Sequence, residues 1–177
     1  MGEKETQQPF SELDNYLQRL EDLRGQVRDL IAGLPAEALN WQPLGGSPDS
    51  PTNSLAVLAA HVAGAEHFWI GEVLGGLPAT RDRDAEFATK VDAPAGLLLR
   101  LEKTAAETRK VFADLSPADL DGTRQARGRT IPVRWCIMQI VDHTATHLGH
   151  MQLTLQLWQG GKGRPSPFWY ERLDSDD

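Results

Sequence analysis

The stretch VRWCIMQIVDHTATHLGHMQLTLQLWQ, residues 133–159, predicts one long helix and carries three of the five histidines of the chain. It directly follows Pro132, and it ends before Gly160 and Gly161, which favour a helix stop. The rest of the fold can be worked out from this helix, because it needs partner helices to bury its apolar positions.

Three other stretches combine apolar periodicity with helix start and stop signals, at about 11–32, 53–74 and 94–112. In the first, Ser11 and Asp14 resemble a capping box. The second can be capped by Asn53 or Ser54. Four helices of about 20 residues would each span roughly 30 Å. The sequence therefore predicts an all-α fold, a four-helix bundle.

The connections between these helices are long. The segment 34–53 contains four prolines and two glycines, which prevent a long helix. Residues 77–93 form a polar link, residues 116–119 predict a capped single turn, and GTRQARGRTIP at 122–132 predicts a short β-ribbon or an ordered loop. Such connections can cross or cap the end of a bundle, so loop length does not set the topology.

Composition predicts a single cytoplasmic domain over residues 1–177, with a core at about 10–160 and a tail at 161–177 anchored by Phe168, Trp169 and Tyr170. With 18 basic and 25 acidic side chains, the net charge of −7 disfavours nucleic acid as a partner. We also expect no membrane span and no signal peptide, because no apolar stretch is long enough. A lone cysteine, Cys136, cannot form an internal disulfide and suits a reducing compartment.

All five histidines lie on two of the predicted helices. At about 100° per residue, His143, His147 and His150 point to nearly the same side of the last helix. His143 and His147 lie about 6 Å apart along the axis, and His147 and His150 about 4.5 Å, so either pair could share one metal ion. A third ligand must come from another helix. We expect His61 rather than His67, because His61 lies among small apolar residues.

Other residues receive weaker assignments. The sequence His-Thr-Ala-Thr-His at 143–147 is not the HExxH motif of a metalloprotease, because no glutamate follows the first histidine. Cys136 is interpreted as a core residue. Asp142 and Glu66 are interpreted as solvated carboxylates in preference to outer contacts of a metal site. Three tryptophans are expected in the core: Trp69, Trp135 and Trp158. A fourth, Trp41, can line a pocket mouth. Four arginines either bind an anionic group or, as the favoured interpretation, form a solvated basic stretch: Arg124, Arg127, Arg129 and Arg134.

Three motifs occur in an order that resembles the DinB/YfiT-like superfamily of metal-dependent proteins. They are LNWQP at 39–43, LAAHVAGAEHFW at 58–69 and VDHTATHLGHMQ at 141–152. The resemblance implies a four-helix bundle with a divalent metal held by His61, His143 and His147. Many members continue with Arg-Gly-Gln after the last ligand, whereas this chain has Leu148, Gly149 and His150. His150 therefore stays a candidate for an outer contact or an alternative ligand, and Asp142 for an outer contact.

Three neutral imidazoles leave a metal with open coordination positions, as in catalytic sites. Imidazole suits several metals, and we expect zinc or nickel first, with iron also compatible. Characterised relatives resemble S-transferases or isomerases that use low-molecular-weight thiols such as bacillithiol or mycothiol, so the resemblance implies a small-molecule substrate and such a thiol. A hydrolase with Asp142 or Glu66 as base is one alternative. A non-catalytic metal-binding bundle that forms a homodimer is another. The resemblance also makes a homodimer the expected assembly.

Overall fold

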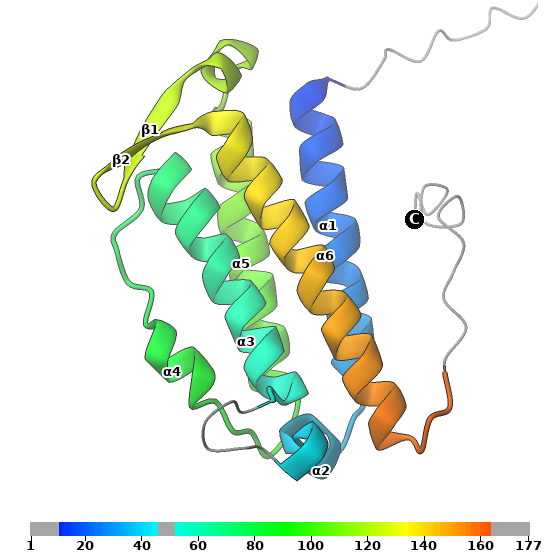
Figure 1. Ribbon diagram of the computed structural model, residues 1–177. Helices are drawn as coiled ribbons and strands as arrows, with labels where there is room; N and C mark the ends of the chain where they lie inside the picture. The colour runs from blue at the N-terminus through cyan, green and yellow to red at the C-terminus, as the bar shows by residue number, and fades with distance from the viewer. Residues whose placement is uncertain (1–10, 46–51, 164–177) are drawn as a thin grey trace, which may run out of the picture.

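The computed structural model describes residues 11–45 and 52–163. The predicted tail anchors Phe168, Trp169 and Tyr170 lie outside the described residues. Four long helical segments lie side by side (Figure 1), joined by short helices and a two-stranded ribbon. In chain order the elements are α1 (Glu12–Ile31), α2 (Ala36–Asn40), η1 (Pro43–Gly45), α3 (Leu55–Glu66), η2 (His67–Leu74), α4 (Arg83–Phe87), α5 (Ala95–Asp114), η3 (Pro117–Asp121), β1 (Thr123–Ala126), β2 (Arg129–Pro132) and α6 (Val133–Trp158). The predicted all-α class is confirmed, with the ribbon as an addition.

The helix starts follow the capping signals of the sequence. Ser11 and Asp14 form a reciprocal capping box at the start of α1. Ser54, rather than Asn53, caps α3 by accepting a hydrogen bond from the backbone N–H of Val57. These side chains satisfy backbone N–H groups that a helix start would otherwise leave without partners.

The predicted second helix is continuous, but its second half differs from expectation. From His67 to Leu74 it continues as a π-helix, η2, which is wider than an α-helix. Two glycines in and after this segment allow the close packing: a Cβ on Gly71 would crowd the ring of His67, and one on Gly75 would overlap Val111. The widened segment carries Phe68 and Trp69 beside the candidate site.

The helices pack around two apolar clusters. α1 contacts α5 and α6, and α3 contacts the same two helices. One cluster includes Ile31 and Met151, and the other includes Ile70 and Ile137. Along α6, His143 and His147 lie between the buried residues of the second cluster, which end at Ile140, and those of the first, which begin at Leu148. The site is thus held by packed core on both sides.

Glu66 corrects a sequence-based interpretation. It is not a solvated carboxylate: its side chain is 1% exposed. Arg24 of α1 donates two hydrogen bonds to it, at 2.6 and 3.2 Å, and Thr108 of α5 donates a third at 2.6 Å. The residue looks solvated in sequence because its charged partner lies 42 positions away. This buried pair connects α1, α3 and α5.

The tryptophans also differ in part from expectation. Trp135 and Trp158 were expected in the core, but they are 47% and 39% exposed. Trp158 packs against Trp41, with ring centroids 5.8 Å apart. Cys136 is fully buried, as expected for a core residue, and burial raises the pKa of its thiol.

The segments outside the long helices also take definite structures. Residues 122–132 form the predicted ribbon, in which β1 pairs antiparallel with β2. The polar link 77–93 contains α4, capped by Asp82, which the sequence analysis did not predict. No helix in the described part of the chain is both long enough and apolar enough to cross a membrane.

Candidate metal centre

Three histidines from two helices meet in the middle of the molecule. His61 lies on α3, and His143 and His147 lie one turn apart on α6. Each offers a ring nitrogen, and these three nitrogens lie within 4.8 Å of one another. The Nε2 atoms of His61 and His143 are 3.1 Å apart. The structure therefore brings together the three residues that the family resemblance implied, and their role as ligands stays a prediction.

The other candidate residues lie outside this cluster. His150 is exposed, and its ring centroid is 5.5 Å from that of His147. Asp142 is exposed and makes no hydrogen bond or ion pair with any residue of 11–45 or 52–163. His67 points to α5, where its Nδ1 lies 2.7 Å from a carboxylate oxygen of Glu107.

A buried carboxylate supports His61. Glu86 of α4 is fully buried, and its Oε2 lies 2.9 Å from the Nδ1 of His61. If Nδ1 carries the proton and donates a hydrogen bond to Glu86, the lone pair of Nε2 is left free and faces His143. A carboxylate behind a histidine is the usual support of a metal ligand, since it fixes the ring orientation and the tautomer.

Arg81 completes this arrangement. It donates two hydrogen bonds to Glu86, at 2.8 and 2.9 Å. Burial alone would raise the pKa of Glu86, but the hydrogen bonds from Arg81 and His61 outweigh burial and lower that pKa to about 2. Glu86 is therefore a carboxylate at neutral pH, the form that can accept a hydrogen bond from the Nδ1–H of His61.

Gly64 explains how Glu86 can reach His61. A Cβ built on Gly64 would overlap the carboxylate of Glu86. Glycine within a helix usually costs about 0.5–1 kcal/mol relative to alanine. Here it provides the space that α4 needs to place a carboxylate against α3.

Of the three histidines of α6, His143 and His147 are held in their neutral form. Burial, followed by repulsion from the neighbouring imidazoles, lowers the pKa of His143 from 6.5 to about 3. The same two causes lower the pKa of His147 to about 4. The Nδ1 atoms of both rings are buried and have no hydrogen-bond partner among the described residues. The neutral imidazole is the form that binds a metal ion.

The spacing of the nitrogens also fits a metal ion. In a tetrahedral zinc site with bonds of about 2.0–2.1 Å, two imidazole nitrogens lie roughly 3.3 Å apart. The 3.1 Å between His61 and His143 is close to that value. The donor set, its protonation state and its spacing thus agree with a divalent cation, without defining which one.

A pocket of about 420 Å³ opens beside His61 and His143. Its walls come from α3, η2, the segment around α4, the β-ribbon and the start of α6, and they are both aromatic and basic. Trp69 and Trp135 pack edge to face in this wall, with ring centroids 5.3 Å apart. A small molecule in this pocket would lie directly against the histidine cluster.

Sequence analysis missed Glu86 and Arg81, because both lie in the segment interpreted as a polar link. Two signals in the sequence could have indicated them. Asp82 can cap a turn that contains Glu86, and Gly64 is a glycine in the middle of an otherwise strong helix. Neither signal identifies the partner by itself, since 25 positions separate His61 from Glu86.

The fold is similar to that of three solved structures. A DinB-like protein from Bacillus cereus ATCC 10987 has a TM-score of 0.66 at 17% identity, over 86% of this chain and 95% of that one. A conserved protein from Enterococcus faecalis has a TM-score of 0.67 at 15% identity, over 86% and 99%. A DinB-like protein from Bacillus subtilis has a TM-score of 0.61 at 16% identity, over 88% and 96%. The chain thus has the fold of DinB-like proteins.

The chain belongs to the family described as mycothiol-S-transferase, whose sequence model matches residues 15–160. The predicted membership of the DinB/YfiT-like superfamily is thereby confirmed. No curated protein matches this chain.

Proposed function

We propose that this protein is a metal-dependent thiol S-transferase. The observation that carries the proposal is the cluster of three imidazoles at the edge of a pocket of about 420 Å³. The family description points to mycothiol as the thiol, and bacillithiol is a second thiol to test. The second substrate is a small electrophile.

His61, His143 and His147 would hold the cation, with zinc or nickel expected first and iron also compatible. When bound, a divalent cation with an open coordination position lowers the pKa of a thiol or water that binds there. Glu86 keeps the Nδ1 proton of His61 on the far side of the ring, so Nε2 stays available. Arg81 holds Glu86 in place through its two hydrogen bonds.

The pocket would position the electrophile against the thiol. The aromatic wall of Phe68, Trp69 and Trp135 offers a flat apolar surface and excludes water from part of the pocket. In a substitution, the thiol sulfur forms a bond to carbon, the leaving group departs with its bonding electrons, and the thiol proton goes to solvent. Bringing both reactants into one pocket removes much of the entropic cost of their encounter.

The hydrolase alternative is less well supported. It needs a carboxylate near a metal-bound water to act as general base. Glu66 is buried in its pair with Arg24, Asp142 is exposed, and Glu86 is already bonded to Arg81 and His61. No aspartate or glutamate among the described residues lines the pocket.

We also propose a homodimer in the cytoplasm. Low-molecular-weight thiols act in a reducing compartment, which agrees with the lone buried Cys136. On α6, Met138, Leu153 and Leu157 are about half exposed, and such apolar side chains favour association. Sedimentation of the wild type and of Leu153→Glu tests the assembly, and a monomeric wild type contradicts it.

Thiol transfer can be tested with mycothiol or bacillithiol and chlorodinitrobenzene, whose thioether product absorbs light. We expect turnover by zinc- or nickel-loaded protein, no turnover after chelation, and recovery when metal is returned. Turnover should be lost in His143→Ala and kept in His150→Ala, which changes a histidine on the same helix outside the cluster. Metal-independent turnover, or none with either thiol, would contradict the proposal.

A further inference from the structure

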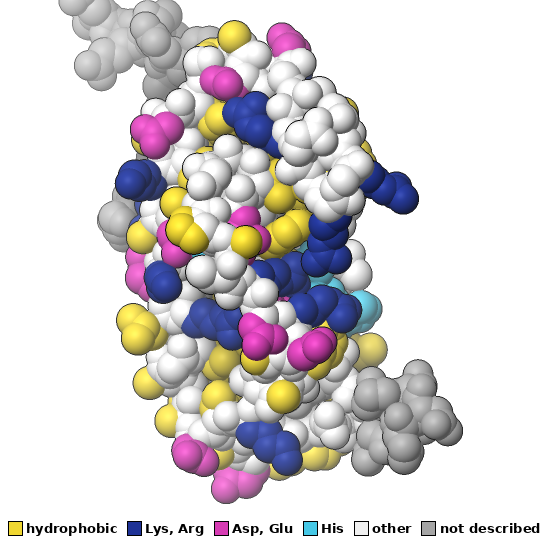
Figure 2. All heavy atoms as spheres, turned by 90° about the vertical axis from the view of Figure 1, so that its left-hand side faces the viewer, with side chains coloured by type: hydrophobic (Ala, Val, Ile, Leu, Met, Phe, Trp, Pro, Cys, Tyr) yellow, Lys and Arg dark blue, Asp and Glu magenta, His cyan; other side chains and the backbone are white. Residues whose placement is uncertain are grey.

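The pocket beside the histidines is basic, although the chain as a whole has a net charge of −7. No aspartate or glutamate of the described residues lines it, whereas four arginines do: Arg81, Arg83, Arg127 and Arg129. Figure 2 shows basic side chains gathered next to histidine on this face of the molecule. Charge in this pocket is therefore opposite in sign to that of the rest of the protein.

Most of this positive charge is uncompensated. Arg81 is neutralised by Glu86. Arg83, Arg127 and Arg129 form no ion pair with any residue of 11–45 or 52–163. By contrast, Arg124 and Arg134, from the same basic stretch, pair with carboxylates outside the pocket. The basic stretch thus divides into two arginines that form ion pairs, Arg124 and Arg134, and two that form none with the described residues, Arg127 and Arg129.

Arg127 occupies an unusual backbone position. It lies in the two-residue turn between β1 and β2 with a φ of +49°, followed by Gly128 at +74°. Turns of this kind favour asparagine, aspartate or glycine, because other side chains are strained there. From this position the guanidinium of Arg127 lies 5.2 Å from the ring centre of Phe68, in the pocket wall. The strained turn thereby holds a cation over the pocket.

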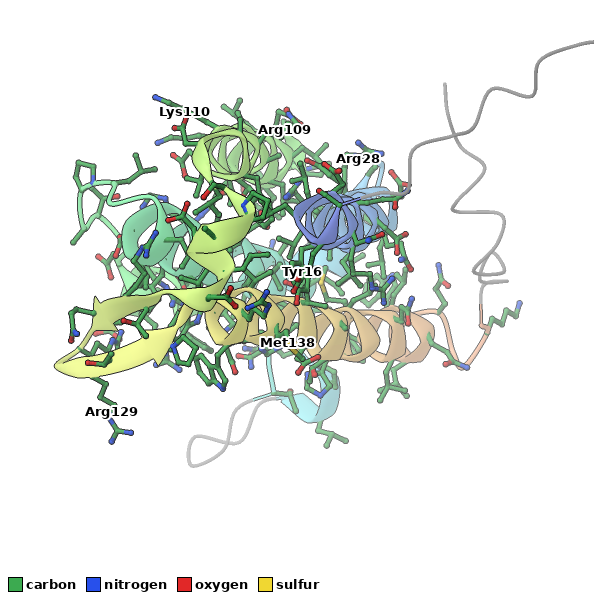
Figure 3. The ribbon with its side chains drawn as sticks, turned by 90° about the horizontal axis from the view of Figure 1, so that it is seen from above. Tyr16, Arg28, Arg109, Lys110, Arg129 and Met138 are labelled. Atoms are coloured by element: carbon green, nitrogen blue, oxygen red, sulfur yellow. The ribbon has the colours of Figure 1, made fainter. Side chains whose placement is uncertain are left out.

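The other arginines differ in their placement. Arg83 lies over the ring of Phe87, 4.6 Å from its centre, at the rim near His61. Arg129 lies on β2, and Figure 3 shows its side chain directed outward from the helices. Arg127 and Arg83 are therefore the two uncompensated cations that face a bound molecule.

We propose that this pocket selects a carboxylic acid with a flat apolar skeleton as the substrate that meets the thiol. The arginine guanidiniums match a carboxylate in shape and charge, and the aromatic pair Trp69 and Trp135 offers a surface for the skeleton. The role of the acid as a substrate rests on the proposed function. The preference of the pocket for an acid rests on the arginines alone.

The preference can be tested by NMR with benzoate and benzamide, which share size and shape but differ in charge. The full-length protein is titrated after metal chelation, so that no bound cation can hold the carboxylate, and again after zinc loading. We expect benzoate to shift the indole N–H signals of Trp69 and Trp135 but not those of Trp41 and Trp158. Benzamide should bind at least about tenfold more weakly, since it makes no ion pair.

Three variants identify the residues that carry the preference. Arg127→Asn removes the charge and suits the turn, so the ribbon is kept. We expect Arg127→Asn and Arg83→Gln each to weaken benzoate binding about tenfold, with little effect on benzamide. Arg28→Gln is the control for lost charge, because Arg28 is exposed on α1 and lies away from the ribbon in Figure 3.

Equal binding of benzoate and benzamide would overturn the inference, as would unchanged benzoate binding in both pocket variants. The readout does not depend on metal or turnover. An acid-selective pocket in a protein that binds no metal would therefore contradict the proposed function alone. A metal-dependent transferase without acid selectivity would contradict this inference alone.

Discussion

Glu86 is the residue on which the geometry of the candidate centre most depends. It is fully buried, yet it is charged, because Arg81 and His61 together hold its pKa near 2. A buried carboxylate is costly unless it is paired, so its presence beside a histidine requires a reason. Supporting His61 in one tautomer, with Nε2 turned toward His143, provides that reason.

The substitution Glu86→Gln keeps the size of this side chain and removes its charge. We expect zinc affinity to fall about 10- to 100-fold, the usual effect of losing a partner of a metal-bound histidine. Competition with a chromophoric chelator measures the affinity, and NMR of the His61 ring nitrogens reports the tautomer. Glu102→Gln, an exposed glutamate on α5, is the control. Unchanged affinity together with an unchanged tautomer would show that Glu86 has no such role.

Acid should destabilise the metal-free protein through His143 and His147. Their pKa values are about 3 and about 4 in the fold, against 6.5 for an ordinary histidine. As the pH falls below 6.5, the unfolded chain takes up protons that the folded chain does not. The contribution of these two histidines to the free energy of unfolding is therefore fully present above pH 6.5. It is lost progressively as the pH falls toward 4 and then 3.

Each of the two histidines adds a slope of up to about 1.4 kcal/mol per pH unit in this window. Urea unfolding from pH 7 to pH 4 with chelator present measures it. The double variant His143→Leu and His147→Leu should show a shallower pH dependence, whereas His150→Leu should keep most of the wild-type slope. Equal slopes in all three proteins would contradict the assigned pKa shifts.

At the scale of elements, the contact between α3 and α4 depends on Gly64. A methyl group there would overlap Glu86, so Gly64→Ala should push α4 away from His61. Gly25 in α1 has open space around the same position. Gly25→Ala should stabilise the protein by about 0.5–1 kcal/mol, the usual gain in a helix.

Gly64→Ala should instead lower both the stability and the zinc affinity. Thermal unfolding and chelator competition on the two variants make the comparison. If Gly64→Ala stabilised the protein as Gly25→Ala does and left the metal affinity unchanged, close approach of Glu86 would not be required.

The buried pair of Arg24 and Glu66 connects three of the long helices. Glu66→Ala removes the buried partner of Arg24, which keeps only the partly exposed Glu21, and should cost about 3–5 kcal/mol. Asp29→Ala, which breaks an exposed pair on α1, should change stability by less than about 1 kcal/mol. Replacing both buried partners, with Arg24→Met and Glu66→Leu, should recover much of the loss. Urea unfolding measures all three, and a small effect of Glu66→Ala would contradict the importance of the pair.

The long helices and their caps could be predicted from sequence, because the signals are local. These signals are the helical periodicity of apolar residues, the capping residues Ser11 and Ser54, and the glycines that end helices. The three histidines of α6 could be placed on one side of the helix for the same reason. The pairs His61 with Glu86 and Arg24 with Glu66 could not, because they join residues 25 and 42 positions apart and depend on how helices pack. Sequence predicts a buried Trp135, but the residue is half exposed in the pocket wall. The apolar pattern of a helix does not show which of its sides other elements will cover.

At the scale of the whole molecule, an acidic chain surrounds a basic pocket that opens onto three histidines. The net charge of −7 predicts that nucleic acid is not a ligand, and this stays a prediction. The same negative charge would disfavour binding of small acids elsewhere on the surface. The positive charges of Arg83 and Arg127 therefore set the pocket apart from the rest of the surface. The centre itself lies between the two apolar clusters, where helices α3 and α6 are held on both sides.

The central claim is that His61, His143 and His147 bind a divalent metal. Its most direct test is the metal content per chain of protein purified without a histidine tag, by elemental analysis. We predict about one zinc or nickel ion per chain in the wild type and in His150→Ala, and loss of the ion in His143→Ala and His147→Ala. A wild type that takes up no metal after incubation with zinc or nickel, or cluster variants that retain it, would contradict the claim.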